Sequence, residues 1–440
     1  MNIVWVREDI YTENAFWAQL PGNFAHIARN ALISSLNFSG FFSAHNFPSG
    51  QVKDLHWRTP IALLETTSQT AYFMNFHVHD LGNFTAIGPS GSGKTVLLNF
   101  LMAQAMRVKP TPRCVLFDKD RGAEIYVRAL GGRYQVLTPG EASGLNPFQI
   151  EDTPQSRTFL VQLLSFMLRP PEGPLTAAEA RVISDAVDEL FSLEREDRSL
   201  VVMSELLRGR IRGSMDDLAS RLDPWLKESA RGWLFNNPQD ELDFDRRVVG
   251  FDMTKVLDDP EIRTAALLYI FHRVREILDG TPALIFLDEG WRLLDDEVFV
   301  DFIKDMLKTI RKRNGIVGFG TQSASDVVAS KVGPTLIEQT STNIFFPNAK
   351  ADDESYVKAF KLSKREMDFI RATAPESRCF LIRHAQDSVI AKMNLVGMPD
   401  LIKVLSGRTE TVVECEKLRA HLGDEPGRWL PAFCGWEVQP

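Results

Sequence analysis

Eight residues between positions 88 and 95 combine the side chains and the spacing needed to bind a polyphosphate: Gly88, Pro89, Ser90, Gly91, Ser92, Gly93, Lys94 and Thr95. In a G-x-x-x-x-G-K-[ST] run, the glycines let backbone N–H groups point at the phosphates, and the lysine reaches the β and γ phosphates. Thr95 offers a hydroxyl to Mg²⁺, and the helix that continues through Val96 adds its positive N-terminal dipole. The run predicts a nucleotide site without identifying the nucleotide.

The flanks of this run decide between two interpretations. A glycine-rich turn can simply join a strand to a helix and bind nothing. Here a strand-like apolar segment, Phe84–Ile87, precedes the run, and a helix-like segment, Val96–Met106, follows it. This strand, loop and helix context is the one that a phosphate-binding loop requires, so it favours nucleotide binding.

Two adjacent carboxylates form the second chemical feature. The apolar run Ala283–Leu287 predicts a buried strand, and Asp288 and Glu289 follow it directly. Nucleotide hydrolysis needs such groups beside a phosphate loop: Asp288 would hold Mg²⁺ through water, and Glu289 would polarise the attacking water. The alternative is a buried strand whose last residues are merely solvated.

Four further polar residues are candidates for the same chemistry. Gln322 falls where the predicted strand 316–322 leaves the sheet, so its amide could sense the γ phosphate or position water. Arg311 and Arg313, just before that strand, could reach a neighbouring subunit's nucleotide as arginine fingers, although the helix dipole also favours cations at a helix C-terminus. Arg383, in a predicted hairpin, could face a nucleotide or pair with a carboxylate.

His77 and His79 resemble a pair of metal ligands. No Cys, His or carboxylate stands at a usual metal-binding distance from them in the sequence, so we interpret both as strand residues.

Positioning these side chains calls for a parallel sheet whose strands end at the site. Short apolar runs predict such strands at 84–87, 113–118, 134–137, 248–252, 283–289 and 316–322, and a strand pair at 61–64 and 72–76 precedes them. Helical spacing dominates between about 155 and 235, and a further helix is expected from Ala15 to Ser35. The fold class is therefore α/β, with a mostly parallel central sheet and an inserted all-helical subdomain.

These elements predict five segments along the chain. They are an N-terminal entry segment, 1–57; the first part of the nucleotide-binding domain, 58–152; the helical insertion, 153–237; the second part of the domain, 238–398; and a helical tail, 399–440.

Composition limits the function classes. The net charge of −8 over 440 residues gives no global case for nucleic-acid binding, which is possible but unsupported. The four cysteines include no C-x-x-C pair, which fits a reducing compartment. No apolar run approaches the roughly 18 residues that span a bilayer, so we expect membrane association to be peripheral or through partners.

The chain resembles the conjugation and type IV secretion ATPases of the CagE/TrbE/VirB kind, ring-forming RecA-like P-loop motors of the HerA/FtsK class. Besides the loop, the carboxylates and Gln322, the resemblance rests on segments spread over nearly the whole chain: Ala15–Asn23, Phe47–Gly50, Phe117–Ile125, Gly144–Phe148, Leu287–Trp291 and Thr321–Ser323.

This resemblance implies ATP hydrolysis with Mg²⁺ at the cytoplasmic face of the inner membrane, coupled to pilus assembly and substrate export. It also implies self-association into a ring, expected to be a hexamer, and contacts with other inner-membrane components and ATPases of the secretion system. Full-length relatives carry a large N-terminal domain, and the sequence here is similar to their motor half. Neither the transported substrate nor the docking surfaces follow from the sequence.

Two other functions remain open. The chain could be a DNA-pumping motor, either a conjugative coupling protein or an FtsK-like translocase, although the acidic composition and the lack of a membrane-spanning segment weigh against a coupling protein. It could also be a scaffold in which ATP binding organises partners with little turnover.

Overall fold

The computed structural model describes residues 9–27, 32, 34–41, 48–170, 173–208, 210, 218–226, 231–289 and 297–436. The chain divides into two compact units, one before and one after the junction between residues 47 and 48.

The first unit contains short helices: α1 (Thr12–Trp17), the 3-10 turn η1 (Phe24–His26) and α2 (Ser35–Phe41). The helical stretch predicted around Ala15 to Ser35 is interrupted, because the chain leaves the α-helix after Trp17 and turns at Gly22, where φ is +85°. Residues 28–31 and 33 of that stretch lie outside the described residues. Pro21 beside a glycine is a strong helix-breaking pair, and it outweighs the apolar spacing. None of the residues of α1 is buried.

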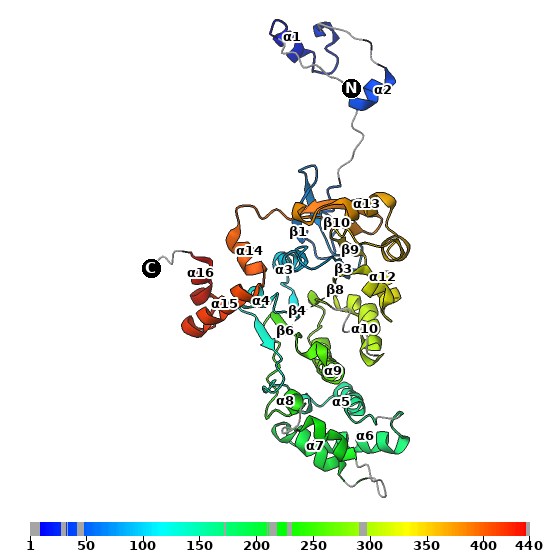
Figure 1. Ribbon diagram of the computed structural model, residues 1–440, viewed down its shortest axis with the longest axis vertical. Coiled ribbons are helices and arrows are strands. Elements are labelled where there is room, and N and C mark those ends of the chain that lie inside the picture. The colour runs from blue at the N-terminus through cyan, green and yellow to red at the C-terminus, as the bar shows by residue number, and fades with distance from the viewer. Residues whose placement is uncertain are drawn as a thin grey trace. The chain divides into compact units, whose positions relative to one another are not determined.

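Within the described residues, eleven strands form one sheet in the order β2-β1-β11-β10-β9-β3-β8-β7-β4-β6-β5. Neighbours from β9 to β5 run parallel, and the neighbours from β2 to β9 run antiparallel (Figure 1). The strands are β1 (Ala62–Thr66), β2 (Ala71–Met74), β3 (Phe84–Ile87), β4 (Arg113–Asp118), β5 (Arg133–Val136), β6 (Val248–Asp252), β7 (Ala283–Leu287), β8 (Gly315–Thr321), β9 (Thr342–Phe345), β10 (Cys379–His384) and β11 (Asp387–Lys392). The predicted α/β class with a mostly parallel sheet is confirmed.

Helices cover both faces of this sheet. The α-helices are α3 (Lys94–Ala105), α4 (Glu124–Ala129), α5 (Pro154–Met167), α6 (Ala177–Phe191), α7 (Leu200–Leu207), α8 (Gly232–Phe235), α9 (Pro260–Glu276), α10 (Glu297–Thr309), α11 (Ala324–Ala329), α12 (Gly333–Gln339), α13 (Lys364–Ala372), α14 (Pro399–Leu405), α15 (Thr409–Leu422) and α16 (Pro426–Cys434). The remaining turns of helix are η2 (Pro147–Gln149), η3 (Arg195–Asp197), η4 (Leu218–Trp225), η5 (Val256–Asp258), η7 (Ile310–Arg313), the π-helical η8 (Glu354–Ala359) and η9 (Pro375–Ser377).

Alternation along each central strand builds a separate core on each face. Phe84, Leu116 and Phe286 point to the face that α3 covers, where they share one hydrophobic cluster. Ile285 and Val317 point the other way, into a cluster that includes residues of α9 and α10. The central strands are buried on both faces, which explains their continuous apolar sequences.

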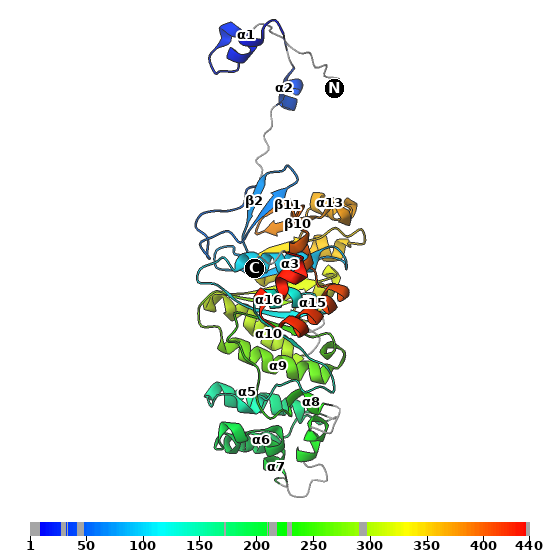
Figure 2. The ribbon, with the colours of Figure 1, turned by 90° about the vertical axis from the view of Figure 1, so that its left-hand side faces the viewer.

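The helices α5 to α8 are inserted between β5 and β6, and both ribbon views place them beyond α9, away from the sheet (Figures 1 and 2). Thr176 caps α6 with a reciprocal capping box to Glu179, and Thr153 caps α5 through its side chain. These caps supply partners for N–H groups that a helix start leaves unpaired. The insertion is helical throughout its described elements.

The free edge of β2 is partly occupied by the segment before it. The N–H of Phe73 donates to the carbonyl of Ser49 at 2.8 Å, and Gly50 forms a bridge with the same residue. Gly50 has φ +71°, and a Cβ there would lie 2.1 Å from the carbonyl oxygen of Phe73. Only glycine allows this close approach.

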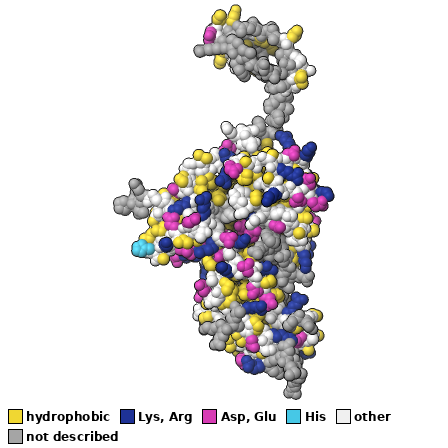
Figure 3. Space-filling view, in the orientation of Figure 1, with side chains coloured by type: hydrophobic (Ala, Val, Ile, Leu, Met, Phe, Trp, Pro, Cys, Tyr) yellow, Lys and Arg dark blue, Asp and Glu magenta, His cyan; other side chains and the backbone are white. Residues whose placement is uncertain are grey.

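The C-terminal helices α14 to α16 pack on α4. Trp429 is fully buried in a small cluster with Ile125, Val412 and Phe433, so core packing explains this tryptophan. Trp436 is half exposed. On the face seen in Figure 3, basic and acidic side chains are interspersed. Among the described residues, no helix is both long and apolar enough to cross a bilayer.

Candidate nucleotide-binding site

The phosphate loop leaves the sheet at Ile87 and enters α3 at Lys94. The N–H of Gly88 donates to the carbonyl of Thr321 on β8, at 3.0 Å, which ties the loop to its neighbouring strand. Gly91 and Gly93 have φ of +78° and +94°, values that disfavour any residue with a Cβ. A Cβ on Gly88 would lie 2.5 Å from Cβ of Phe346. The glycines of the motif are therefore required by the backbone itself.

Lys94 lies beside both predicted carboxylates. Its Nζ is 3.4 Å from Oε1 of Glu289 and 3.7 Å from Oδ1 of Asp288, and Lys94 and Glu289 are buried. The strand order β3-β8-β7 explains the encounter, because only one strand separates the loop from the end of β7. Burial raises the pKa of Asp288, and the Lys94 ammonium opposes that rise. The buried Lys94 ammonium therefore offsets part of the charge of the two carboxylates.

Gln322 contacts the same carboxylate oxygen of Glu289 as Lys94 does. Its Nε2 donates to Oε1 of Glu289 at 2.8 Å. Glu289 itself has a left-handed backbone, with φ +53°, which costs free energy in a residue that carries a Cβ. The structure thus brings together Lys94, Asp288, Glu289 and Gln322, which the sequence places in three separate segments.

These residues line a cavity of about 370 Å³. Its other lining residues come from the phosphate loop, the loop after β4, the residue before β10 and the segment after α14: Pro89, Ser90, Gly91, Gly93, Thr95, Val96, Lys119, Asp120, Gly122, Arg378, Ser406, Gly407 and Arg408. The sequence analysis missed Lys119, Asp120, Arg378 and Arg408. Lys119 and Asp120 could have been found, since they directly follow a predicted strand that ends at the site.

The lining fits a nucleotide with Mg²⁺. Residues of the phosphate loop and the Lys94 ammonium line the cavity together, so backbone N–H groups and a cation stand where a polyphosphate would bind. Thr95 and Asp288 bring a hydroxyl and a carboxylate to the same cavity, which are the oxygen donors that Mg²⁺ prefers beside phosphates. Elsewhere in the described chain, no group of three or more His, Cys, Asp or Glu residues could hold a metal, and His77 is buried.

His77 and His79 are not strand residues, contrary to our interpretation. They follow the end of β2, in a turn with one isolated bridge between Val78 and Leu81. His79 has φ +56°, a value incompatible with a strand.

The three predicted arginines do not line the cavity of their own chain. Arg311 and Arg313 lie in η7, which precedes β8. They therefore stand at the N-terminal ends of the parallel strands, and the phosphate loop stands at the C-terminal ends. Arg311 lies 3.7 Å from Asp80, and Arg313 donates to the carbonyl of Arg275. Arg383 donates to the carbonyls of Phe360 and Lys361, at 2.7 and 2.6 Å, and does not face the nucleotide site of its own chain.

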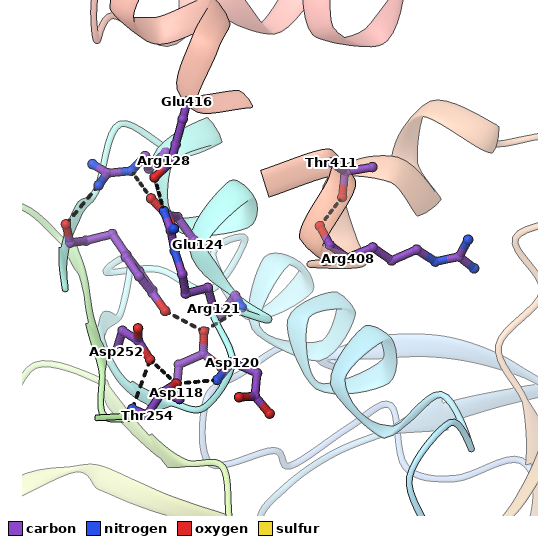
Figure 4. Close-up of polar contacts among 12 residues, drawn as sticks. Asp118, Asp120, Arg121, Glu124, Arg128, Asp252, Thr254, Arg408, Thr411 and Glu416 are labelled. Atoms are coloured by element: carbon purple, nitrogen blue, oxygen red, sulfur yellow. Dashed lines mark hydrogen bonds and ion pairs between the residues drawn. The ribbon is translucent and has the colours of Figure 1, made fainter. Parts of the chain in front are cut away.

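An ion-pair cluster fixes the loop after β4, which lines one side of the cavity. Arg121 donates to Glu124 of α4 and to Glu416 of α15, and Arg128 donates to the same Glu124 (Figure 4). The N–H of Asp120 donates to Oγ1 of Thr254 at 2.7 Å. Asp120 and Arg121 both have φ +59°, and these contacts hold that conformation.

Asp118 anchors the base of this loop. It accepts hydrogen bonds at 2.7 Å from the N–H of Ala123 and the hydroxyl of Tyr134. Burial raises the pKa of Asp118 to about 8, although both hydrogen bonds oppose the shift.

Comparison with known proteins finds a P-loop domain family and relatives that are named as type IV secretion system proteins. The profile of the TraG P-loop domain matches residues 73–372. The type IV secretion system protein virB4 of Bartonella henselae is 43% identical over 98% of this chain and 54% of its own length. PtlC of Bordetella pertussis, also named a type IV secretion system protein, is 37% identical over 95% of this chain and 53% of its own length. The chain spans about half the length of these curated relatives.

Two solved structures share the fold. VirB4 of Thermoanaerobacter pseudethanolicus superimposes with a TM-score of 0.62 at 19% identity, over 76% of this chain and 96% of that one. The bacterial conjugative coupling protein TrwB, without its N-terminal segment, gives a TM-score of 0.50 at 15% identity, over 76% of this chain and 89% of that one. At these identities the likeness concerns the fold alone.

Proposed function

Because the chain belongs to the family of TraG P-loop domains, with type IV secretion proteins of the VirB4 kind as its relatives, we propose that it is an ATPase motor that energises type IV secretion. The motor binds ATP with Mg²⁺ and hydrolyses it to ADP and phosphate. The observation that carries this proposal is the meeting of Lys94, Glu289 and Gln322 in the phosphate-loop cavity.

Each side chain has a distinct task in this proposal. Lys94 binds the β and γ phosphates, and in doing so it exchanges carboxylate partners for phosphate oxygens. Thr95 and Asp288 would hold Mg²⁺, which supplies charge neutralisation at the phosphates when bound. Glu289 polarises the attacking water, and Gln322 orients the Glu289 carboxylate through the 2.8 Å hydrogen bond.

The proposal extends to the assembly, the partners and the location of the motor. The chain self-associates into a ring, expected to be a hexamer, and contacts other inner-membrane components and ATPases of the secretion system. It works on the cytoplasmic side, peripheral to the inner membrane through these partners. Its organisation keeps the five segments predicted above, with the helical insertion at 153–237 inside the nucleotide-binding domain.

Two variants test the hydrolytic site. Lys94→Ala removes the phosphate contact, so both ATP binding and turnover should be lost. Glu289→Gln keeps the shape of the side chain but weakens its action on water, so kcat should fall by about 10²- to 10⁴-fold while ATP still binds. Phosphate release and binding of a fluorescent ATP analogue measure the two effects. Hydrolysis that persists in both variants would contradict the proposal.

One feature favours a second candidate, a scaffold with low turnover. The Lys94 ammonium is paired with Glu289, and hydrolysis needs Lys94 on the phosphates and Glu289 on the attacking water instead. Steady-state turnover at concentrations where the chain assembles separates the two candidates, since a scaffold binds ATP without cycling.

A further inference from the structure

Two arginines of the same chain line the phosphate-loop cavity, although no motif marks them. Arg378 immediately precedes β10, and Arg408 follows α14 and precedes α15. Both belong to segments more than 280 residues from the phosphate loop, as their numbers show. Their presence adds two cations to the cavity that the phosphate loop lines.

The sheet register explains how Arg378 reaches the loop. Phe345 of β9 pairs with Ile87 of β3 on one side and with Leu381 of β10 on the other. Because β10 runs antiparallel to β9, residues before Leu381 extend past the end of β3, where the phosphate loop begins. The Nη1 atom of Arg378 lies 3.9 Å from the point that a Cβ on Gly93 would occupy. The guanidinium is therefore beside the residue that caps α3.

The backbone of Arg378 is fixed although its side chain is exposed. Its N–H donates to the carbonyl of Pro375 at 3.1 Å, and its φ is +57°. The next residue, Cys379, donates its N–H to Oγ of Ser377. Left-handed backbone in a residue with a Cβ is unfavourable, and such strain is concentrated at functional sites.

Arg408 is brought to the cavity by contacts of its own segment. Asn99 of α3 donates both to the carbonyl of Leu405 and to that of Gly122, at 2.9 and 3.2 Å. Gly407 packs so closely on Gly122 that a Cβ would lie 2.5 Å from it. Figure 4 shows the side chain of Arg408 extending away from the Arg121 ion-pair cluster without reaching any of the residues drawn.

Charge balance in the cavity singles out these two arginines. Lys94 lies beside Asp288 and Glu289, and Lys119 lies 3.9 Å from Asp120. These pairs account for the three carboxylates among the lining residues. Within the described chain, neither the Arg378 nor the Arg408 guanidinium has an ion-pair or hydrogen-bond partner, so two cations remain for an anionic ligand.

We propose that Arg378 and Arg408 bind the polyphosphate of the nucleotide in cis, as a second set of phosphate ligands beside the phosphate loop. The inference rests on the proposed ATP-binding function and adds residues to that site. Arginine suits this task, because its planar guanidinium can give two parallel hydrogen bonds to phosphate oxygens. A subunit would then hold the phosphates through both the loop and these two arginines before any neighbour contributes an arginine.

Binding of a fluorescent ATP analogue with Mg²⁺ tests the proposal, at a protein concentration where sedimentation shows a monomer. Arg378→Ala and Arg408→Ala should each raise Kd by roughly tenfold, and the double variant should raise it further. Arg378→Lys keeps a charge and should bind with intermediate affinity. Alanine also carries a Cβ, so Arg378→Ala adds no new strain at the left-handed backbone.

Arg365→Ala is the matched control, since Arg365 is an exposed arginine on α13 that does not line the cavity. It should leave Kd unchanged. Competition by inorganic tripolyphosphate should weaken in Arg378→Ala by the same factor as ATP binding, because the contact is to phosphate and not to the base.

The outcomes separate this inference from the proposed function. If the wild-type chain binds ATP and both arginine variants bind it equally well, the arginine assignment is overturned and the ATP site stands. An equal loss in Arg365→Ala would also overturn it, because the effect would then be one of overall charge. If the wild-type chain does not bind ATP, both proposals fail.

Discussion

At the scale of single residues, the polar side chains of the candidate site form two sets, which differ in whether they already have a partner. Lys94 and Gln322 both contact Glu289, whereas the guanidinium groups of Arg378 and Arg408 have no partner among the described residues. A bound polyphosphate would offer oxygens to both sets. The site therefore combines groups that must change partners with groups that only gain one.

His77 provides a residue-scale prediction about pH. Burial, helped by the neighbouring His56 and His384, lowers the pKa of His77 to about 3. The unfolded imidazole takes up a proton near pH 6.5, but the folded one does not, so the folded state loses stability as pH falls from about 6.5 towards 3. The slope is at most about 1.4 kcal/mol per pH unit.

Urea unfolding at about pH 7 and about pH 5 measures this effect. The His77→Phe variant has no imidazole to protonate, so its free energy of unfolding should fall less between the two pH values than that of the wild type. His79→Asn is the control, because His79 is exposed and asparagine tolerates its left-handed backbone. Equal pH dependence of His77→Phe and the wild type would refute the assignment.

At the scale of elements, a neighbouring strand controls the position of Asp288, one of the two carboxylates of the candidate site. Gly320 on β8 lies against Asp288, and a Cβ there would be 2.6 Å from Oδ1 of Asp288. The Gly320→Ala change should push the carboxylate out of place without breaking the sheet. Since Asp288 is the proposed Mg²⁺ ligand, Mg²⁺ binding should lose about 1 kcal/mol of free energy. The Mg²⁺ concentration for half-maximal turnover should then rise several-fold.

A Mg²⁺ titration of ATP turnover checks this prediction. Gly427→Ala on α16 is the matched control, because nothing lies within 4 Å of the Cβ that it would add. An unchanged Mg²⁺ requirement in Gly320→Ala would mean that Asp288 does not hold the ion.

Several strands of the sheet were predictable from the sequence. The runs 84–87, 113–118 and 248–252 coincide with β3, β4 and β6, because strands buried on both faces must be continuously apolar. Strand β9 escaped prediction, since two of its four residues are polar and are satisfied only by distant partners: Thr342 by the carbonyl of Phe76, and Asn343 by Thr85. Long-range contacts of this kind leave no local pattern.

The residues of the candidate site also include some that the sequence indicated and some that it did not. Lys94, Asp288, Glu289 and Gln322 each stand at the end of a recognisable strand or in a motif, so the sequence pointed to them. Arg378 and Arg408 stand in short connections, and only the register of β10 on β9 and the packing of Gly407 on Gly122 bring them to the loop.

At the scale of the whole molecule, the proposed ring predicts that sites can be completed between subunits. Arg311 and Arg313 lie at the N-terminal ends of the parallel strands, whereas the phosphate loop lies at their C-terminal ends. In a head-to-tail ring they could therefore face the next subunit's site. A chain with Lys94→Ala and a chain with Arg311→Ala and Arg313→Ala should each be inactive. Random mixing should restore roughly a quarter of the wild-type turnover, at interfaces that join an intact lysine to intact arginines.

ATP turnover of the mixture, with assembly followed by light scattering, tests this trans arrangement. A mixture of Lys94→Ala with wild type serves as the control for subunit exchange. Mixed assemblies that form but turn over no faster than the separate variants would exclude a trans role for these arginines.

The segment at Ser49 and Gly50 has a consequence for solubility. An uncovered strand edge presents unpaired N–H and C=O groups to any other chain, which is a common route to aggregation. By pairing with Phe73, these two residues take up part of the outer edge of β2, the last strand of an eleven-stranded sheet. They therefore act as a guard against edge-to-edge association, and a protein shortened to begin at Gln51 should precipitate more readily even though its nucleotide site would be complete.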